Sequence, residues 1–187
     1  MTAGIVLAAG ESTRMGKPKQ LLEIAGQTML QRVVDAALAS RLDHVAVVLG
    51  YHAADVRASL AERAVSFVEN DGYSEGLGSS VRAGLQALPP AADAAMFLLG
   101  DQPGVTAELI NRLLAESTGE NIVAPNVGGR RGNPTLFGRK WFAQLARVSG
   151  NAGGRSIIDG HPEALTLVQT SADLRDVDTP EDLAGWD

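Results

Sequence analysis

The stretch Gly4-Ile5-Val6-Leu7-Ala8-Ala9-Gly10-Glu11-Ser12-Thr13-Arg14-Met15-Gly16-Lys17-Pro18-Lys19 sets a short apolar run directly before a loop of small and basic residues. A run of this length that ends at glycine is typical of a buried strand rather than a helix. Further short apolar runs, each bounded by Gly, Pro, Asn or Asp, follow at His44–Leu49, Val65–Val68, Ala94–Leu99 and Ile122–Ala124. The chain is therefore expected to contain at least five buried strands, the first at Gly4–Ala9.

Segments with a 3.6-residue apolar period separate these runs, and they predict helices at Thr28–Ser40, Ala53–Arg63, Ser79–Leu88 and Thr106–Glu116. Strands that alternate with helices favour an α/β fold with a mostly parallel central sheet covered on both faces. We therefore expect a single-domain, three-layer αβα Rossmann-like fold over residues 1–187, with ligands at the carboxyl ends of the strands. Beyond residue 126 the pattern loosens into glycine-rich turns, a short helix near Lys140–Arg147, and a last strand and helix.

The composition excludes several classes of function. The chain has 187 residues, and 16 Lys and Arg against 22 Asp and Glu give it a formal charge of −6. An acidic chain has no general attraction for nucleic acid, so no nucleic-acid partner is expected. The absence of cysteine excludes thiolate metal sites and thiol nucleophiles, which leaves oxygen-liganded metals such as Mg²⁺. No apolar stretch is long enough to cross a membrane, so we expect a cytoplasmic protein with no membrane partner.

The loop after the first strand has the chemistry of a phosphate site. Glycine and small residues let successive backbone N–H groups approach phosphate oxygens, and Arg14 and Lys19 add two positive charges five residues apart. The dinucleotide fingerprint G-x-G-x-x-G and the P-loop pattern G-x-x-x-x-G-K-[ST] are both absent here. These features favour a triphosphate site, and the alternative is an ordinary surface loop.

Two acids follow apolar runs and are candidates for metal ligands. Asp101 comes directly after the run Ala94–Leu99, which predicts that its carboxylate lies at the carboxyl edge of a central strand. Asp178 follows the short run Leu174–Val177 and precedes Thr179 and Pro180, so it could instead belong to a helix start. Mg²⁺ prefers one or two carboxylates together with phosphate oxygens, and this pair would supply them.

The run L-A-A-G-x-S-x-R-M-G-x-x-K resembles the signature of nucleotidylyltransferases with a glycosyltransferase-A-like α/β fold, the nucleotide-diphospho-sugar transferase type. The chain is similar over nearly its full length to the molybdenum cofactor cytidylyltransferase branch. Four further segments match this branch in order: Glu75–Leu85, Leu99–Pro103, Gly132–Phe137 and Asp176–Leu183. Relatives in the branch commonly carry His at the position of Asn133 and an acid at the position of Asn151, so the acceptor stays open.

The resemblance implies roles for particular residues. Catalysis would rest on Arg14, Lys19 and Asp101, and Asp101 and Asp178 would hold Mg²⁺, with Asp176 in a structural role. The nucleotide would be bound by Leu7, Ala8, Ala9, Gly10, Arg14, Lys19, Asn70, Gly76, Ser79 and Ser80. The acceptor would be bound by Gly132, Asn133, Pro134 and Arg155, beside the basic residues Arg130 and Arg131. The alternatives are a serine-capped helix for the residues near Ser79 and a solvated loop for the arginines.

The implied activity is transfer of CMP from CTP, or of a nucleotide from another NTP, to a phosphorylated acceptor such as molybdopterin, with a molybdenum hydroxylase as a partner. Ala9 stands where guanylyl-transferring relatives tend to have glycine, which favours CTP. Three alternatives stay open. They are a cytidylyltransferase for a polyol, choline or sugar phosphate, an oxidoreductase of a blue nicotine-derived pigment, and a non-catalytic nucleotide-binding protein that delivers the cofactor.

Overall fold

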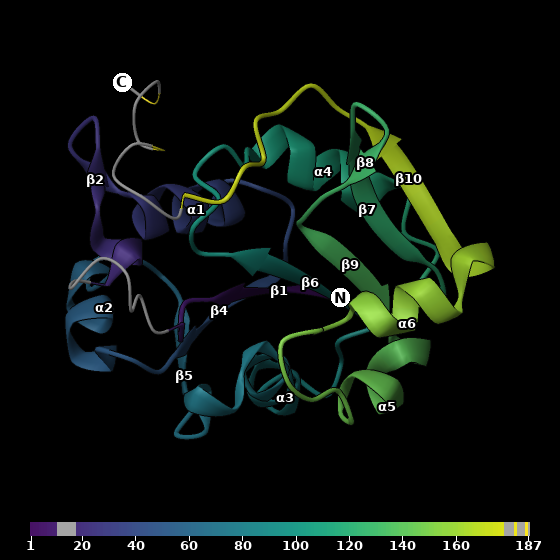
Figure 1. Cartoon of the computed structure of the whole chain (residues 1–187), viewed down its shortest axis with the longest axis horizontal. Coiled ribbons are helices and arrows are strands. Elements are labelled where there is room, and N and C mark those ends of the chain that lie inside the picture. The colour runs from purple at the N-terminus through teal and green to yellow at the C-terminus, as the bar shows by residue number, and fades with distance from the viewer. Residues whose placement is uncertain (11–17, 178–181, 183–185, 187) are drawn as a thin grey trace.

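An eight-stranded mixed sheet forms the middle layer of the computed structural model, which describes residues 1–10, 18–177, 182 and 186 (Figure 1). The strand order is β10-β7-β9-β6-β1-β4-β5, and β8 pairs with β7. The strands are β1 (Thr2–Leu7), β4 (His44–Leu49), β5 (Ser66–Glu69), β6 (Ala94–Leu99), β7 (Ile122–Val127), β8 (Arg130–Arg131), β9 (Thr135–Gly138) and β10 (Leu165–Gln169). A separate antiparallel pair joins β2 (Glu23–Ile24) to β3 (Gln27–Thr28).

Four of the seven described strand pairs in the eight-stranded sheet are parallel, so the mostly parallel sheet that the sequence predicted is confirmed. β1 pairs in parallel with β4 and with β6, β4 with β5, and β7 with β10. β9 lies antiparallel between β6 and β7, and the sequence does not predict it as a strand. Its four residues are too short a run to stand out beside the glycine-rich stretch that precedes them.

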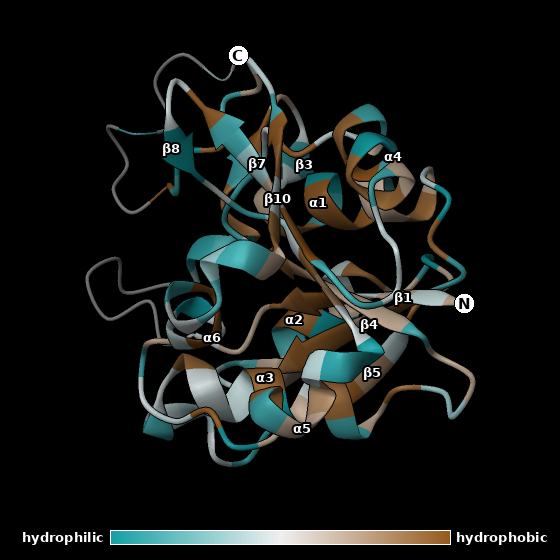
Figure 2. Cartoon of the chain, turned by 90° about the vertical axis from the view of Figure 1, so that its right-hand side faces the viewer, coloured by the Kyte–Doolittle hydropathy of each residue, from teal (hydrophilic) through white to brown (hydrophobic). Residues whose placement is uncertain are grey.

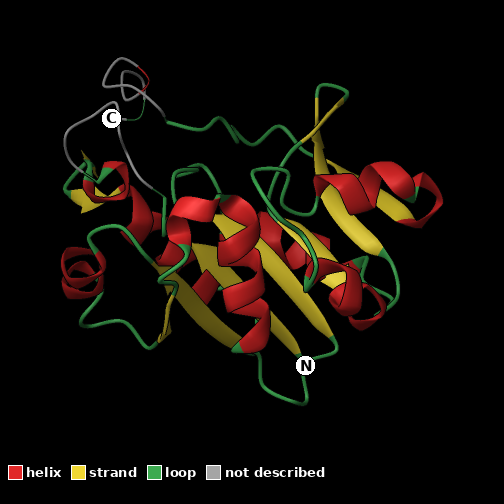
Figure 3. Ribbon diagram, turned by 60° about the horizontal axis from the view of Figure 1, so that its bottom comes forward, coloured by secondary structure: helices red, strands yellow, loops and turns green. Residues whose placement is uncertain are grey.

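Helices cover both faces of the sheet, so the expected three-layer αβα arrangement is confirmed (Figures 1 and 3). One face carries α1 (Met29–Leu38), α2 (Ala53–Ser59) and α4 (Ala107–Ala115), and the other carries α3 (Leu77–Gln86), α5 (Phe142–Leu145) and α6 (Arg155–Gly160). Short 3-10 helices complete the described elements at η1 (Lys19–Leu21), η2 (Tyr73–Glu75), η3 (Arg139–Trp141) and η4 (Pro162–Ala164). No helix in the described part of the chain combines the length and apolarity needed to cross a membrane.

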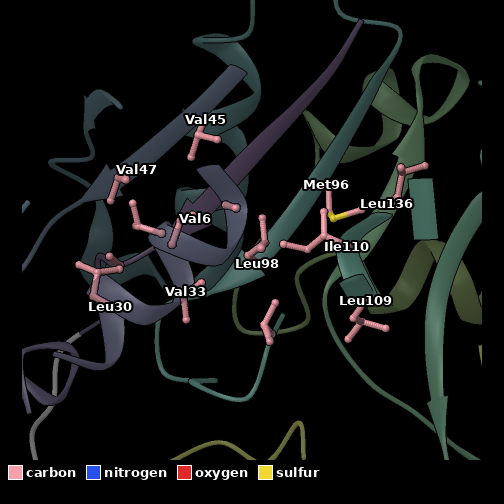
Figure 4. Packing of buried hydrophobic residues seen from close by; sticks show 14 of the residues in the cluster. Val6, Leu30, Val33, Val45, Val47, Met96, Leu98, Leu109, Ile110 and Leu136 are labelled. Carbon is pink, nitrogen blue, oxygen red and sulfur yellow. The ribbon is translucent and has the colours of Figure 1, made fainter. Parts of the chain in front are cut away.

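Alternating side chains of the strands divide the core into two halves. Val6 on β1 and Leu98 on β6 pack towards α1 and α4, whereas Ile5 and Phe97 on the same strands pack towards α3 and α5. Figure 4 shows the first half, where Leu30 of α1 lies in one cluster with side chains of β1, β4, β6, β9 and α4. Burying one such aliphatic side chain stabilises the fold by about 1.5–3 kcal/mol. Hydrophobic segments gather in the central strands, whereas the β8 region is hydrophilic (Figure 2).

Local signals at the helix ends explain most boundaries. Thr28 caps α1 by accepting a hydrogen bond from the Gln31 N–H, and the Gln31 side chain accepts one from the Thr28 N–H in return. α2 ends at Ser59, earlier than the predicted Arg63, because the next residues form turns and the Arg63 guanidinium turns to Asp35, with donor–acceptor distances of 2.7 and 2.9 Å. The sequence gives no clear signal for α6. The last strand that it predicts corresponds to β10.

The chain returns to the sheet edge after β10. Residues 171–177, which we call the C-terminal strap, have no regular secondary structure. The strap passes the end of β6, where the Val177 N–H donates to the Asp101 carbonyl at 3.1 Å. The helix predicted to begin near Thr179 lies outside the described residues.

Candidate active site

The carboxyl ends of β1 and β6 meet at the edge where α/β sheets bind ligands. The Gly100 N–H donates to the Leu7 carbonyl at 3.1 Å, and a Cβ placed on Gly100 would lie 3.1 Å from that same oxygen. Glycine therefore lets the two strand ends approach each other closely. Asp101 follows directly, so its carboxylate lies beside the loop that leaves β1.

A buried glutamine joins the described start and end of the loop that follows β1. Gln20 is only 4% exposed, and its Nε2 donates to the carbonyls of Ala8 and Gly10 at 3.4 and 3.3 Å. Because Gln20 belongs to η1, this contact also fixes the neighbouring Lys19. Arg14, the other predicted basic residue, falls within 11–17 and lies outside the described residues.

The first-loop lysine and the β6 acid form an ion pair. Lys19 Nζ lies 2.6 Å from Asp101 Oδ2, and the two side chains are 20% and 18% exposed. An ion pair that is largely shielded from solvent is screened less by salt than a surface pair. The sheet edge thus holds together a cation suited to phosphate and a carboxylate suited to a metal, as their positions in the sequence predicted.

The loop between β5 and α3 is held from inside by an asparagine. Asn70 Nδ2 donates to the hydroxyls of Ser79 and Ser80, each at 3.0 Å, while its Oδ1 accepts from the Gly72 N–H at 3.1 Å. Gly76 has φ of 100°, a conformation that only glycine adopts without strain. A Cβ there would lie 2.4 Å from Asn151 Oδ1, so this loop packs tightly against the segment that follows α5.

A cleft of about 450 Å³ opens between these loops, within the range of about 300–1,000 Å³ typical of small-molecule sites. Six of the predicted nucleotide-binding residues line it: Leu7, Ala9, Gly10, Lys19, Gly76 and Ser80. Asp101 lines it as well. Ala8, Asn70 and Ser79 are buried instead, and the hydrogen bonds of the last two support the wall rather than face the cleft. We call this the nucleotide cleft; the contacts of its residues with nucleotide stay predictions.

A second pocket of about 370 Å³ adjoins the nucleotide cleft. Its lining includes the predicted acceptor residues Gly132, Asn133 and Arg155. Pro134 is buried and joined to Asn133 by a cis peptide bond. Four residues line both hollows: Leu7, Leu77, Leu99 and Asn151. The two hollows therefore lie side by side.

Polar residues beyond the predicted Gly132, Asn133 and Arg155 also line the second pocket. Arg131, Asn151 and Asp176 line it. The sequence places Arg131 in a basic cluster at which a phosphorylated acceptor could dock, and in the structure it pairs with Asp159 of α6 at 3.2 Å. Asp176 is expected to be structural. The sequence signals for it are its place two residues before Asp178 and at the start of the matching segment Asp176–Leu183, because nothing in the local pattern indicates that the C-terminal strap returns to the site.

Asp101 has the donor chemistry of a Mg²⁺ ligand. Its hard carboxylate oxygens face a cleft large enough for a triphosphate, and Mg²⁺ takes one or two carboxylates plus phosphate oxygens. Within the described ranges no group of three or more His, Asp or Glu side chains forms a ready-made metal cage. Asp178, the predicted second ligand, lies outside the described residues.

Comparison with known protein families agrees with the nucleotidyltransferase resemblance of the sequence. The family model described as "MobA-like NTP transferase domain" matches residues 4–165. "Purine catabolism protein PucB" from Bacillus subtilis is 30% identical, with 96% of this chain and 92% of that protein covered. "Nicotine blue oxidoreductase" from Paenarthrobacter nicotinovorans is 31% identical, with 96% and 93% covered.

A solved structure extends the comparison to the fold and to metal. The Mycobacterium tuberculosis H37Rv protein Rv0371C in complex with manganese superposes with a TM-score of 0.83 at 31% sequence identity, and the match covers 97% of this chain and 95% of that one. A structural relative of similar length thus binds a divalent metal.

Proposed function

Because the chain belongs to the family of MobA-like NTP transferase domains, and is a nucleotidyltransferase by fold and family, we propose that it transfers CMP from CTP to molybdopterin and releases pyrophosphate. The observation that carries the proposal is the Lys19–Asp101 ion pair in the wall of the nucleotide cleft. This pair brings a phosphate-binding cation and a metal-binding carboxylate to one strand edge. The adjoining pocket supports a separate acceptor, because it shares only part of its lining with the cleft.

The proposed chemistry is an in-line displacement at phosphorus. A phosphate oxygen of the acceptor forms a bond to the α-phosphorus of CTP. The bond from that phosphorus to the oxygen bridging the α and β phosphates breaks, and pyrophosphate leaves with the electron pair. The acceptor phosphate is already ionised near neutral pH, so the reaction needs no general base.

Catalysis would then consist of positioning and charge neutralisation. Lys19 and Arg14 bind the triphosphate and offset the charge that develops on the leaving pyrophosphate. Asp101 and Asp178 would hold Mg²⁺, which supplies Lewis-acid neutralisation of the phosphate oxygens when bound. Ser80 and the backbone at Gly76 orient the nucleotide, and Arg155 and Asn133 bind the acceptor.

The names of the two relatives define the alternatives. An oxidoreductase of nicotine blue would need a hydride donor, but the loop after β1 lacks the G-x-G-x-x-G pattern of dinucleotide sites. A binding protein for cofactor delivery would not need a lysine and an acid paired in the nucleotide cleft. Nucleotidyl transfer uses both groups.

Pyrophosphate release tests the proposal directly. The wild-type protein is assayed with Mg²⁺ and each of CTP, GTP, ATP and UTP, with and without molybdopterin. We expect release that requires the acceptor and is fastest with CTP. Release with another phosphorylated acceptor but not with molybdopterin would overturn the acceptor assignment, and no release with any pair would overturn the activity.

A matched pair of variants tests the role of the β6 acid. Asp101→Asn keeps the shape of the side chain and removes its charge, and we expect turnover to fall by about 10²–10³-fold. Asp55→Asn makes the same chemical change at a 63% exposed side chain on α2, outside the described lining of the cleft, and should leave turnover unchanged. Equal activity of the two variants would remove Asp101 from the mechanism.

A further inference from the structure

A buried amide fixes one carboxylate in the second pocket. Gln102 is 4% exposed, and its Nε2 donates to Asp176 Oδ1 at 2.7 Å and to the Leu174 carbonyl at 3.0 Å. Both acceptors belong to the C-terminal strap, more than 70 residues along the chain from Gln102. Gln102 therefore holds the strap and orients the carboxylate that the strap presents to the pocket.

The backbone on either side of Asp176 is also fixed. The Val177 N–H donates to the Asp101 carbonyl at 3.1 Å, and the Val177 side chain is fully buried. A Cβ placed on Gly104 would lie 1.8 Å from the Asp173 carbonyl oxygen, so the strap lies directly on the loop after β6. Asp176 is therefore held at a defined point of the pocket wall and not carried on a loose terminus.

The rest of the pocket combines an apolar floor with basic groups. Phe97 and Phe137 lie in the floor and are 6% and 2% exposed, and their rings meet edge to face with centroids 6.0 Å apart. Arg131 and Arg155 line the same pocket and suit a phosphate. Asp176 adds a negative charge to the same pocket, and this charge would repel an acceptor that carried only anionic groups.

A fixed carboxylate in the same pocket as an apolar lining selects for a particular ligand chemistry. A carboxylate has about four acceptor positions, so it can accept hydrogen bonds from several donors at once. The best complement is an apolar ring that carries N–H donors on one edge and a phosphate elsewhere. A polyol or sugar phosphate would leave the apolar floor without a partner, and a choline head group offers no N–H donor.

We propose that Asp176, positioned by Gln102, is a specificity-determining residue that accepts hydrogen bonds from adjacent N–H donors on the ring of the acceptor. The edge of a pterin, with an amino group beside a ring N–H, has this chemistry. The inference rests on the proposed function, because it identifies the group that distinguishes molybdopterin from the other phosphorylated acceptors.

Two small pteridines test the proposal without catalysis. Pterin carries the amino group, whereas lumazine carries a carbonyl oxygen in its place and is otherwise closely similar. Fluorescence titration gives the dissociation constants of both with the wild-type protein and with Asp176→Asn. We expect the wild type to bind pterin about 10- to 100-fold more tightly than lumazine, the effect of a hydrogen bond to a charged group. The Asp176→Asn variant should lose this preference.

Two further variants separate recognition from structure. Asp173→Asn makes the same change on the same strap. Hydrogen bonds from Arg175 hold the pKa of the Asp173 carboxyl below its ordinary value, but its side chain is 42% exposed and it does not line the pocket. This control should keep the pterin preference. Gln102→Met removes the amide at similar volume and should reduce the preference, whereas a variant that lost only packing would lower the melting temperature and leave the preference unchanged.

The outcomes separate this inference from the proposed function. Equal binding of the two pteridines to the wild type, no binding of pterin, or a preference retained in Asp176→Asn would each overturn the role of Asp176. If the wild type also releases pyrophosphate from CTP with molybdopterin, that result leaves the proposed function intact. A pterin preference that depends on Asp176, without pyrophosphate release by any nucleotide and acceptor, would support the inference and overturn the proposed activity.

Discussion

Substitution of Gly76 by alanine should damage the site through two separate effects. The backbone of Gly76 has φ of 100° and ψ of −177°, a conformation that costs a residue with a side chain about 1–3 kcal/mol. The added Cβ would also lie 2.4 Å from Asn151 Oδ1 and 2.9 Å from the Gly150 carbonyl carbon and oxygen. Relief of this overlap requires the Asn151 segment to move, at a further cost of about 1–3 kcal/mol.

The sum is a loss of about 2–6 kcal/mol in the free energy of unfolding, from the two contributions above. A domain of this size loses about 2–4 °C in melting temperature per kcal/mol, so we expect a fall of about 4–24 °C. Gly119→Ala is the matched control, because Gly119 has φ of 79° and no atom within 4 Å of the added Cβ. In this variant only the backbone conformation is strained, so the free energy of unfolding should fall by about 1–2 kcal/mol and the melting temperature by about 2–8 °C.

Thermal unfolding and steady-state kinetics measure the two variants side by side. Gly76→Ala should also raise the KM for CTP, because Gly76 lines the nucleotide cleft, whereas Gly119→Ala should leave it unchanged. Equal losses of stability would show that the contact with the Asn151 segment contributes nothing. An unchanged KM in Gly76→Ala would show that this loop does not shape the nucleotide site.

Three further substitutions separate the support of the cleft from the stability of the scaffold. Asn70→Ala removes the bonds to the Ser79 and Ser80 hydroxyls and should cost about 2–4 kcal/mol in urea unfolding while raising the KM for CTP; a loss of stability alone would limit Asn70 to the scaffold. Thr28→Ala removes the cap of α1 and should cost about 1 kcal/mol with kcat/KM unchanged. Leu98 is fully buried, so Leu98→Ala leaves a cavity in the core and should lower the free energy of unfolding by about 2–5 kcal/mol. A loss below about 1 kcal/mol would show that the core collapses into the cavity.

The layers of the fold follow from local sequence signals. The apolar runs at β1, β4 and β6 are continuous because parallel strands covered on both faces bury all but one side chain in each strand. The start of α4 follows from Thr106, whose hydroxyl accepts from the Leu109 N–H. β9 could not be predicted in the same way, because its place between β6 and β7 depends on pairings with residues far along the chain.

The nucleotide cleft and the second pocket also differ in how far the sequence predicts their residues. Lys19 and Asp101 each stand directly beside an apolar strand or its loop, so the rule for strand ends is enough to predict that they lie at one edge of the sheet. Asp176 belongs to the second pocket only because the C-terminal strap crosses the sheet edge. Its position depends on contacts that span more than 70 residues, and no spacing within the sequence indicates them.

Neutral amides connect the segments that form both hollows. Gln20 joins the two ends of the first loop, Asn70 joins β5 to α3, and Gln102 joins the end of β6 to the C-terminal strap. All three are at most 8% exposed, although Asn and Gln usually lie at the surface. Their amide N–H groups donate to buried carbonyls, hydroxyls and a carboxylate that water would otherwise solvate. An amide also adds no charge beside a site whose field is set by Lys19 and Asp101. A carboxylate in the same positions would repel a triphosphate, and an ammonium would compete with Lys19 for the carboxylate of Asp101.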